Sequence, residues 1–181
     1  MTAGARGYFG IGVERISKPM NLGALLRTAH AFGASFAFTV AAAFPAREVR
    51  LSDTSDSAGH LPLYEAATID ELKLPKGCVL VGVELSEAAV DLPSFRHPLS
   101  AAYILGPERG SLSAAVEARC AHVVRIPTRF CINVGLAGAL VMYDRLISLG
   151  RFAPRPLSPG GPAEALPAHV HGGQKFRREE K

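Results

Sequence analysis

The chain has 181 residues, of which 48% are hydrophobic and 20% are charged, with a formal net charge of +4 and an isoelectric point near 9.2. This length and hydrophobic content suffice for one sizeable core and exclude an intrinsically disordered protein. No apolar run approaches the roughly 18 residues of a membrane span, and no apolar leader precedes the first strand-like segment. The three cysteines are widely spaced and predict neither disulfides nor a zinc site. We therefore expect a cytoplasmic protein with reduced thiols and no membrane contact.

The start of the chain predicts a strand, a helix and a second strand. Residues 8–13 form a short apolar run bounded by glycines, which is typical of a strand. Apolar residues then recur at helical spacing after Asn21, a good N-cap residue. Residues 35–40 follow Gly33, a helix-stop signal, and their aromatic and β-branched side chains favour another strand. Such a unit predicts a parallel sheet.

The middle of the chain continues this alternation. Residues 50–59 are rich in Ser and Asp and predict a loop, and residues 69–72 predict a short helix. Residues 78–83 and 101–105 are continuous apolar runs, as expected for parallel strands buried on both faces. A helix capped by Ser113 (residues 113–120), a strand (122–126) and a long helix (133–149) follow. We therefore expect an α/β fold with a mostly parallel sheet flanked by helices.

Composition changes after Gly150, where we place a domain boundary between residues 1–150 and 151–181. Nine of the 31 residues in the second segment are Pro or Gly, and apolar periodicity disappears. Six Lys or Arg against three Glu give this segment +3 of the net charge of +4. We expect a flexible tail with a basic end at residues 175–178, either a solvated tail or an arm that contacts RNA.

Three segments place small and polar residues where the neighbouring chain is apolar. Residues 21–27 read NLGALLR, residues 106–110 read GPERG after a buried strand, and residues 126–133 read IPTRFCIN before the last helix. Glycines after a parallel strand let a ligand approach the backbone, and Asn133 can cap the helix that follows. Each segment alone also fits an ordinary turn, helix cap or surface cation, but together they predict one ligand site built from three loops.

In this order, and followed by an apolar helix, the segments resemble the SpoU (TrmH-like) branch of the SPOUT RNA methyltransferases over residues 13–151. The resemblance implies an α/β domain with a C-terminal trefoil knot, a homodimer, and S-adenosylmethionine bound in the knot. It also implies methylation of a ribose 2′-hydroxyl in RNA, with tRNA favoured over rRNA.

The resemblance also implies roles for single residues. Asn21, Arg27, Glu108 and Asn133 would be the catalytic group. Arg27 would act either as a base or by binding an RNA phosphate, and Glu108 would order its loop or position Arg27. The expected cofactor-binding residues are Val83, Glu84, Leu105, Gly106, Gly110, Ile126, Pro127, Cys131 and Val134. The family usually has Ser-Leu-Asn where this chain has Cys131-Ile132-Asn133, and its loop before this motif is longer.

Two further expectations concern partners and alternatives. The last helix is apolar on nearly every face and must be buried on more than one side, and the resemblance places it at a dimer interface. His30, His60, His97 and His122 show no ligand spacing, so no metal is expected. A noncatalytic RNA- or nucleotide-binding module is the alternative reading, whereas a nicotinamide dehydrogenase would need a Gly-x-Gly-x-x-Gly that the first strand lacks.

Overall fold

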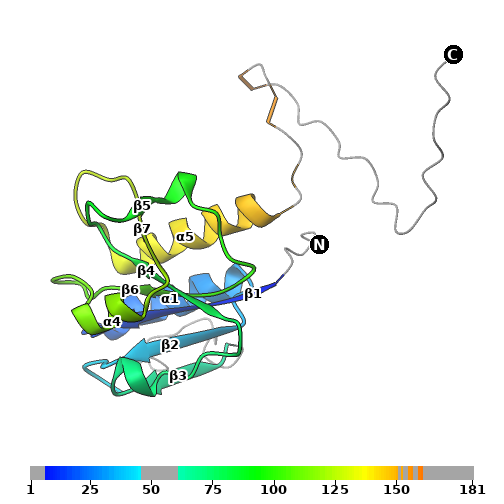
Figure 1. Ribbon diagram of the computed structural model, residues 1–181. Coiled ribbons are helices and arrows are strands. Elements are labelled where there is room, and N and C mark those ends of the chain that lie inside the picture. Colours follow the sequence, from blue (N-terminus) through cyan, green and yellow to red (C-terminus); the bar gives the residue numbers. More distant parts are fainter. Residues whose placement is uncertain (1–6, 46–60, 151, 153–154, 157–158, 161–181) are drawn as a thin grey trace, which may run out of the picture. The chain divides into compact units, whose positions relative to one another are not determined.

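A sheet of seven strands in the order β3-β2-β1-β6-β4-β7-β5 organises the part of the chain described by the computed structural model, residues 7–45, 61–150, 152, 155–156 and 159–160 (Figure 1). Every neighbouring pair is parallel, which confirms the predicted parallel sheet. The strands are β1 (Tyr8–Glu14), β2 (Phe36–Val40), β3 (Leu63–Ala66), β4 (Val79–Val83), β5 (Val90–Asp91), β6 (Ser100–Leu105) and β7 (His122–Arg125).

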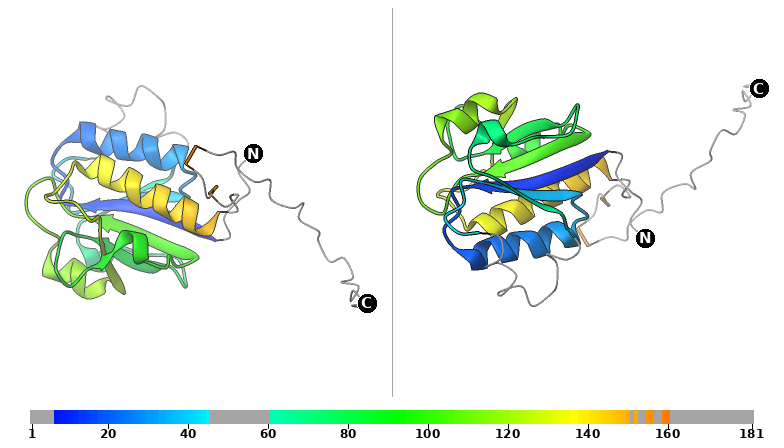
Figure 2. Two further views of the ribbon diagram at one scale, coloured as in Figure 1. Left: turned by 90° about the horizontal axis from the view of Figure 1, so that it is seen from above. Right: turned by 90° about the horizontal axis from the view of Figure 1, so that it is seen from below.

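Helices cover both faces of this sheet. Helices α1 (Pro19–Ala31) and α5 (Val134–Leu149) lie side by side on one face (Figure 2), and α5 approaches α1 closely where Gly138 faces Leu25. The other face carries α4 (Ala114–Arg119) and the 3₁₀ turn η1 (Ile69–Glu71), and a second turn, η2 (Leu92–Ser94), precedes β6.

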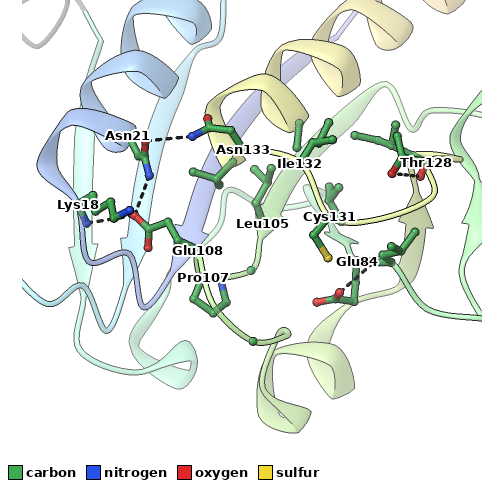
Figure 3. Close-up of a pocket in the computed structure, with 17 residues that line it drawn as sticks. Lys18, Asn21, Glu84, Leu105, Pro107, Glu108, Thr128, Cys131, Ile132 and Asn133 are labelled. Carbon is green, nitrogen blue, oxygen red and sulfur yellow. Dashed lines mark hydrogen bonds between the residues drawn. The ribbon is translucent and has the colours of Figure 1, made fainter.

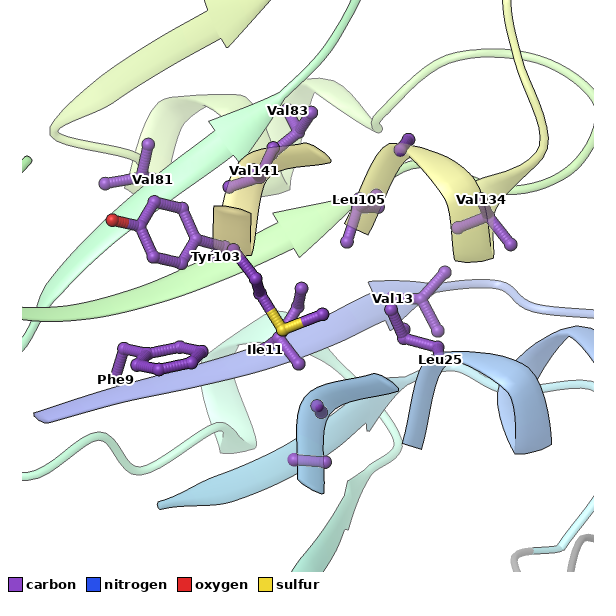
Figure 4. Packing of buried hydrophobic residues seen from close by; sticks show 14 of the residues in the cluster. Phe9, Ile11, Val13, Leu25, Val81, Val83, Tyr103, Leu105, Val134 and Val141 are labelled. Carbon is purple, nitrogen blue, oxygen red and sulfur yellow. The ribbon is translucent and has the colours of Figure 1, made fainter. Parts of the chain in front are cut away.

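Strand β6 shows how one strand serves two cores. Tyr103 and Leu105 pack with β1, α1 and α5 in one cluster, part of which appears in Figure 4. Ala102 and Ile104 pack with β2, η1 and α4 in the other. Because side chains alternate along a strand, an apolar run of this length fills both cores at once.

Most predicted elements are present, and the differences have local causes. The sequence placed the cap of the first helix at Asn21, but α1 begins at Pro19 with Lys18 as its N-cap. The predicted cap was therefore wrong by three residues. Proline at the first helical position has a φ already suited to the helix, which extends it in the N-terminal direction. Ser113 caps α4 as predicted, accepting a hydrogen bond from the Val116 amide.

The strands β3 and β5 were not predicted, because both are short and their local patterns are weak. β3 lies at the sheet edge and two of its four residues are exposed, and β5 has only two residues. The predicted helix at residues 69–72 is the 3₁₀ turn η1.

Several predictions concern segments that the structure does not describe or test. The loop at residues 50–59, His60 and the basic end at residues 175–178 lie outside the described residues. The chain divides into two units after Gly150, but the roles assigned to them stay predictions, as does the trefoil knot. Among the described helices, none is long and apolar enough to cross a membrane.

One face of α5 is apolar and exposed, so burial of this helix on more than one side is not achieved within the single chain. Val141 and Met142 are buried against the sheet. Four large side chains on the opposite face are 62%, 43%, 50% and 37% exposed, namely Leu136, Leu140, Tyr143 and Ile147. Their spacing of four, three and four residues places them in one stripe along the helix.

A buried polar cluster links His97, which lies just before β6, with Tyr103 of β6 and with Asp144 and Arg145 of α5. His97 is fully buried; its Nδ1 lies 2.6 Å from the Tyr103 hydroxyl and its Nε2 lies 2.8 Å from Asp144. Because Arg145 donates to the Tyr103 oxygen, that hydroxyl is free to donate to Nδ1, and Nε2–H then donates to Asp144. Burial lowers the pKa of His97, although Asp144 opposes the shift. The neutral imidazole satisfies every partner in this chain of hydrogen bonds.

Candidate functional site

A cavity of about 400 Å³ lies at the carboxyl ends of the central strands. Residues 105–110 end and follow β6, and residues 83–85 end and follow β4. Residues 126–134 run from β7 to the start of α5, and the start of α1 closes the remaining side (Figure 3). The crevice outside the carboxyl ends of parallel strands is where open α/β sheets bind ligands. The three segments singled out in the sequence therefore meet at one cavity.

A chain of side-chain hydrogen bonds links these three segments. Asn133 caps α5 by accepting from the amides of Gly135 and Leu136, at 2.8 and 3.4 Å. Its Nδ2 therefore points away from the helix and donates to Asn21 Oδ1 at 3.1 Å. Asn21 Nδ2 in turn donates to Glu108 Oε1 at 3.0 Å (Figure 3). These hydrogen bonds fix the relative positions of α5, α1 and the loop after β6.

The Glu108 carboxylate is fully engaged in holding the start of α1. Besides Asn21, it accepts from the backbone amide and hydroxyl of Ser17 at 3.0 and 3.1 Å and from the Lys18 amide at 3.1 Å. Partial burial raises the pKa of Glu108, but these hydrogen bonds outweigh it, so the net shift is downward. A negative charge at the N-terminus of a helix is also favoured by the helix dipole. Glu108 orders the loop and is a poor proton acceptor.

Two more carboxylates hold the far end of the same loop. Glu84 accepts from the Leu112 amide at 2.8 Å, and buried Glu14, at the end of β1, accepts from the Ser113 amide at 2.8 Å. Glu14 was missed in the sequence, although an acidic residue closing an otherwise apolar strand is a usable signal. Arg15, in a left-handed conformation with φ of 51°, donates to the Ser111 carbonyl at 2.6 Å.

Two glycines let the backbone line the cavity. A Cβ at Gly106 would lie 3.3 Å from the Leu112 amide nitrogen and 3.4 Å from Glu84 Oε2, so a side chain there would crowd the loop. Gly110 has a φ of 95°, which L side chains rarely adopt. Both positions therefore expose main chain to a ligand.

Most predicted site residues line this cavity. Asn21, Glu108 and Asn133 do, and so do eight of the nine predicted cofactor-binding residues: Val83, Glu84, Leu105, Gly106, Gly110, Ile126, Cys131 and Val134. Pro127 is exposed beside the cavity and is not among the residues that line it. Lining residues that were not named among the candidate site residues are Pro107, Thr128 and Ile132, which lie within the predicted segments, and Lys18, Leu85 and Ala137, which lie outside them.

Arg27 does not line the cavity. It is exposed on α1, and its side chain makes no hydrogen bond or ion pair within residues 7–45 and 61–150. Arg27 lies six residues beyond Asn21, almost two helical turns from the cavity wall. The predicted catalytic group is thus only partly assembled in one chain.

The chemistry of the cavity is that of a binding site for a small organic molecule. Apolar side chains at the ends of three strands, Val83, Leu105 and Ile126, form much of its wall. Val134 at the start of α5 adds to this wall, and Asn21 and Asn133 supply polar groups. Sites with an apolar wall and a few fixed polar groups are typical of cofactor pockets. In the described part of the chain no group of His, Cys, Asp and Glu could hold a metal ion.

Comparison with known proteins identifies relatives of this chain. Residues 9–143 match the model of the SpoU rRNA Methylase family. Over 138 residues, 71% of this chain and 9% of the relative, the chain is 31% identical to the mouse (Mus musculus) tRNA (guanosine(18)-2′-O)-methyltransferase TARBP1. Over 144 residues it is 30% identical to a putative TrmH family tRNA/rRNA methyltransferase of Staphylococcus aureus, covering 73% of this chain and 56% of that protein.

The fold is also that of a solved methyltransferase. The SpoU methyltransferase AviRb from Streptomyces viridochromogenes, in complex with the cofactor AdoMet, has a TM-score of 0.71 and 23% identity, covering 81% of this chain and 60% of AviRb. This likeness shows a shared fold. The chain spans about half the length of the Staphylococcus aureus relative and much less of the mouse protein.

Proposed function

This chain belongs to the SpoU rRNA methylase family, and we propose that it transfers a methyl group from S-adenosylmethionine to a ribose 2′-hydroxyl in tRNA or rRNA. The observation that carries the proposal is that Asn21, most of residues 106–110 and part of residues 126–134 line one cavity. The names of its relatives, a tRNA 2′-O-methyltransferase and a tRNA/rRNA methyltransferase, support this substrate class. We favour tRNA over rRNA.

The residues of the cavity fit S-adenosylmethionine. A volume of about 400 Å³ lies within the range of small-molecule sites. Val83, Leu105 and Ile126 would contact the adenine, and the main chain at Gly106 and Gly110 would donate to its polar edge or to the methionine carboxylate. Cys131, in place of the family's serine, would line the site with a weak hydrogen-bonding group. Bound there, the cofactor would supply an electrophilic methyl group on its sulfonium.

In this proposal Asn21, Glu108 and Asn133 position the site. Their hydrogen bonds tie together the ends of α1 and α5 and the loop after β6. Because Glu108 already accepts from four donors and its pKa is lowered, it would orient Asn21 and leave the hydroxyl proton to another acceptor. Preorganised polar groups of this kind need not rearrange during the reaction.

We assign Arg27 to the RNA. A guanidinium holds its proton at neutral pH and pairs with phosphate through two hydrogen bonds, so Arg27 would hold the phosphate that aligns the ribose oxygen with the methyl group. Its exposed position outside the cavity lining supports a role at the cavity of a second subunit.

The exposed face of α5 supports the proposed homodimer. Leu136, Leu140, Tyr143 and Ile147 form an apolar stripe, and Met20 at the start of α1 is 74% exposed. Large apolar side chains gathered in this way mark interaction surfaces. A second copy of the chain would bury the stripe and bring Arg27 to the neighbouring cavity. We also infer a cytoplasmic location, with which the free thiols of all three cysteines are compatible.

The test is transfer of tritium from labelled S-adenosylmethionine into separated tRNA and rRNA fractions that lack the modification, followed by mass spectrometry of the nucleosides. We expect a labelled 2′-O-methylnucleoside in the tRNA fraction. Arg27→Ala should abolish incorporation with folding and cofactor affinity retained, whereas Arg96→Ala, at another exposed arginine, should not. Binding of cofactor and RNA without incorporation would favour the noncatalytic module instead.

A further inference from the structure

A second hollow, of about 390 Å³, adjoins the cavity where the loop after β6 meets the start of α1. Its lining consists of Arg15, Ser17, Lys18, Pro107, Glu108 and Arg109. It shares Lys18, Pro107 and Glu108 with the cavity described above, and these three residues are labelled in Figure 3. A molecule in the cavity and a group in the hollow would therefore be neighbours that contact the same three residues.

The charge of this hollow suits an anion. Three of its six lining residues are cations, Arg15, Lys18 and Arg109, and all three are exposed. The acidic residue in the lining, Glu108, has both carboxylate oxygens occupied by hydrogen bonds from Ser17, Lys18 and Asn21. The three cations therefore outnumber a carboxylate that is already paired.

Arg15 is held in place with its guanidinium partly free. One Nη donates to the Ser111 carbonyl at 2.6 Å, and Nε lies 3.7 Å from Glu14, so other N–H groups remain for a ligand. The side chain is 49% exposed. Its backbone is fixed by the bond from the Arg15 amide to the Val40 carbonyl at 2.7 Å. A fixed guanidinium loses less freedom on binding an anion than a mobile one.

Unlike Arg15, Arg109 does not contribute to holding the loop. It lies between Glu108 and Gly110 and makes no hydrogen bond or ion pair within the described ranges 7–45 and 61–150. Its charge is not needed to hold the loop, because Glu14, Glu84 and Glu108 already do so. Arg109 can therefore be removed without disturbing the cavity.

We propose that Arg15, Lys18 and Arg109 bind one phosphate of the RNA backbone beside the nucleotide whose ribose enters the cavity. The inference rests on the proposed function, because RNA is the substrate that carries phosphate next to the acceptor ribose. Arginine fits a phosphodiester well, since its planar fork matches two phosphate oxygens. The methionine carboxylate of the cofactor is the other anion near this loop, and the experiment separates the two.

The experiment measures the affinity of an unmodified tRNA transcript at several salt concentrations. Phosphate contacts do not depend on base sequence, so the transcript is a valid probe before the natural target is known. We expect Arg109→Ala to weaken binding by about two- to tenfold and to reduce the slope of log affinity against log salt by about 0.7–0.9. Arg15→Gly, in which glycine suits the positive φ, should reduce RNA affinity and the salt slope in the same way. The double variant should bind RNA only slightly more weakly than either single variant, because both arginines contact one phosphate.

Arg96→Ala is the matched control, since Arg96 is also exposed but lies before β6, away from the hollow. It should leave the slope unchanged, and affinity for S-adenosylmethionine should stay within twofold in all variants. An unchanged slope in Arg109→Ala would overturn the inference while leaving the proposed function intact. Lower cofactor affinity with an unchanged slope would assign the hollow to the methionine carboxylate. Failure of the wild-type protein to bind RNA would overturn both proposals, whereas a reduced slope without methyl transfer would support the phosphate site alone.

Discussion

Asn133 performs two tasks that substitution can separate. Its Oδ1 caps α5, and its Nδ2 donates to Asn21 across 112 residues of sequence. Asn133→Ala removes both, at about 1 kcal/mol for the cap and about 0.5–1 kcal/mol for an exposed neutral hydrogen bond. Asn133→Ser keeps a capping hydroxyl and loses the donor to Asn21, so it should cost about 0.5–1 kcal/mol.

The assay is urea denaturation followed by circular dichroism at the helix band, with thermal unfolding as a second measure. For a domain of this size about 1 kcal/mol corresponds to about 2–4 °C, so Asn133→Ala should lower the melting temperature by about 3–8 °C. Asn133→Ser should lower it by about 1–4 °C. Titration with S-adenosylmethionine then shows whether losing the link to Asn21 also loosens the cavity.

A double-mutant cycle tests the link itself. If Asn133 and Asn21 are bonded, Asn21→Ala should cost about 0.5–1 kcal/mol less in the Asn133→Ser background than in the wild type. Strictly additive effects would refute the hydrogen bond as a stabilising interaction. Equal losses in Asn133→Ser and Asn133→Ala would refute the capping role.

Three other predictions concern pH, backbone packing and assembly. Burial lowers the pKa of His97 in the fold, so the free energy of unfolding should be highest above pH about 6.5 and should fall as the pH drops below that value. His97→Gln should flatten this dependence when urea unfolding is measured at a series of pH values. Gly12→Ala should destabilise by about 2–3 kcal/mol, because its Cβ would overlap the Phe38 carbonyl oxygen, while Gly82→Ala, which meets only side chains at 3.2 Å or more, should cost under about 1 kcal/mol in the same assay. If the proposed homodimer forms through α5, Leu140→Glu should convert it to monomers in light scattering after size exclusion.

Each of these has an outcome that would contradict it. Acid sensitivity that persists in His97→Gln would place the titrating group elsewhere. Equal destabilisation of the Gly12 and Gly82 variants would mean that the sheet adapts to a backbone clash. A wild-type protein that is already monomeric at micromolar concentration, or a Leu140→Glu variant that stays dimeric, would remove α5 as the interface.

Much of the fold was predictable because its signals are local. Apolar runs of strand length, such as residues 101–105, and good capping residues, such as Ser113 and Asn133, lie within a few residues of the structure they produce. Where a local signal was ambiguous the prediction failed: Asn21 is a good cap by type, but the helix has Lys18 as its cap and begins at Pro19, three residues earlier than predicted. The edge strands β3 and β5 carry too few buried residues to produce a pattern.

The sequence alone determined most of the helices and strands and which three segments are unusual, since hydrophobic period, turn residues and caps act over a few residues. Only the tertiary structure decided what those segments touch. Glu108 meets Asn21 across 87 residues, and Asn133 meets Asn21 across 112, because the strand order brings distant loops to one edge of the sheet. The same packing leaves Arg27 outside the cavity and one face of α5 uncovered. Such contacts depend on how elements are ordered in space, which the local pattern of the chain does not specify.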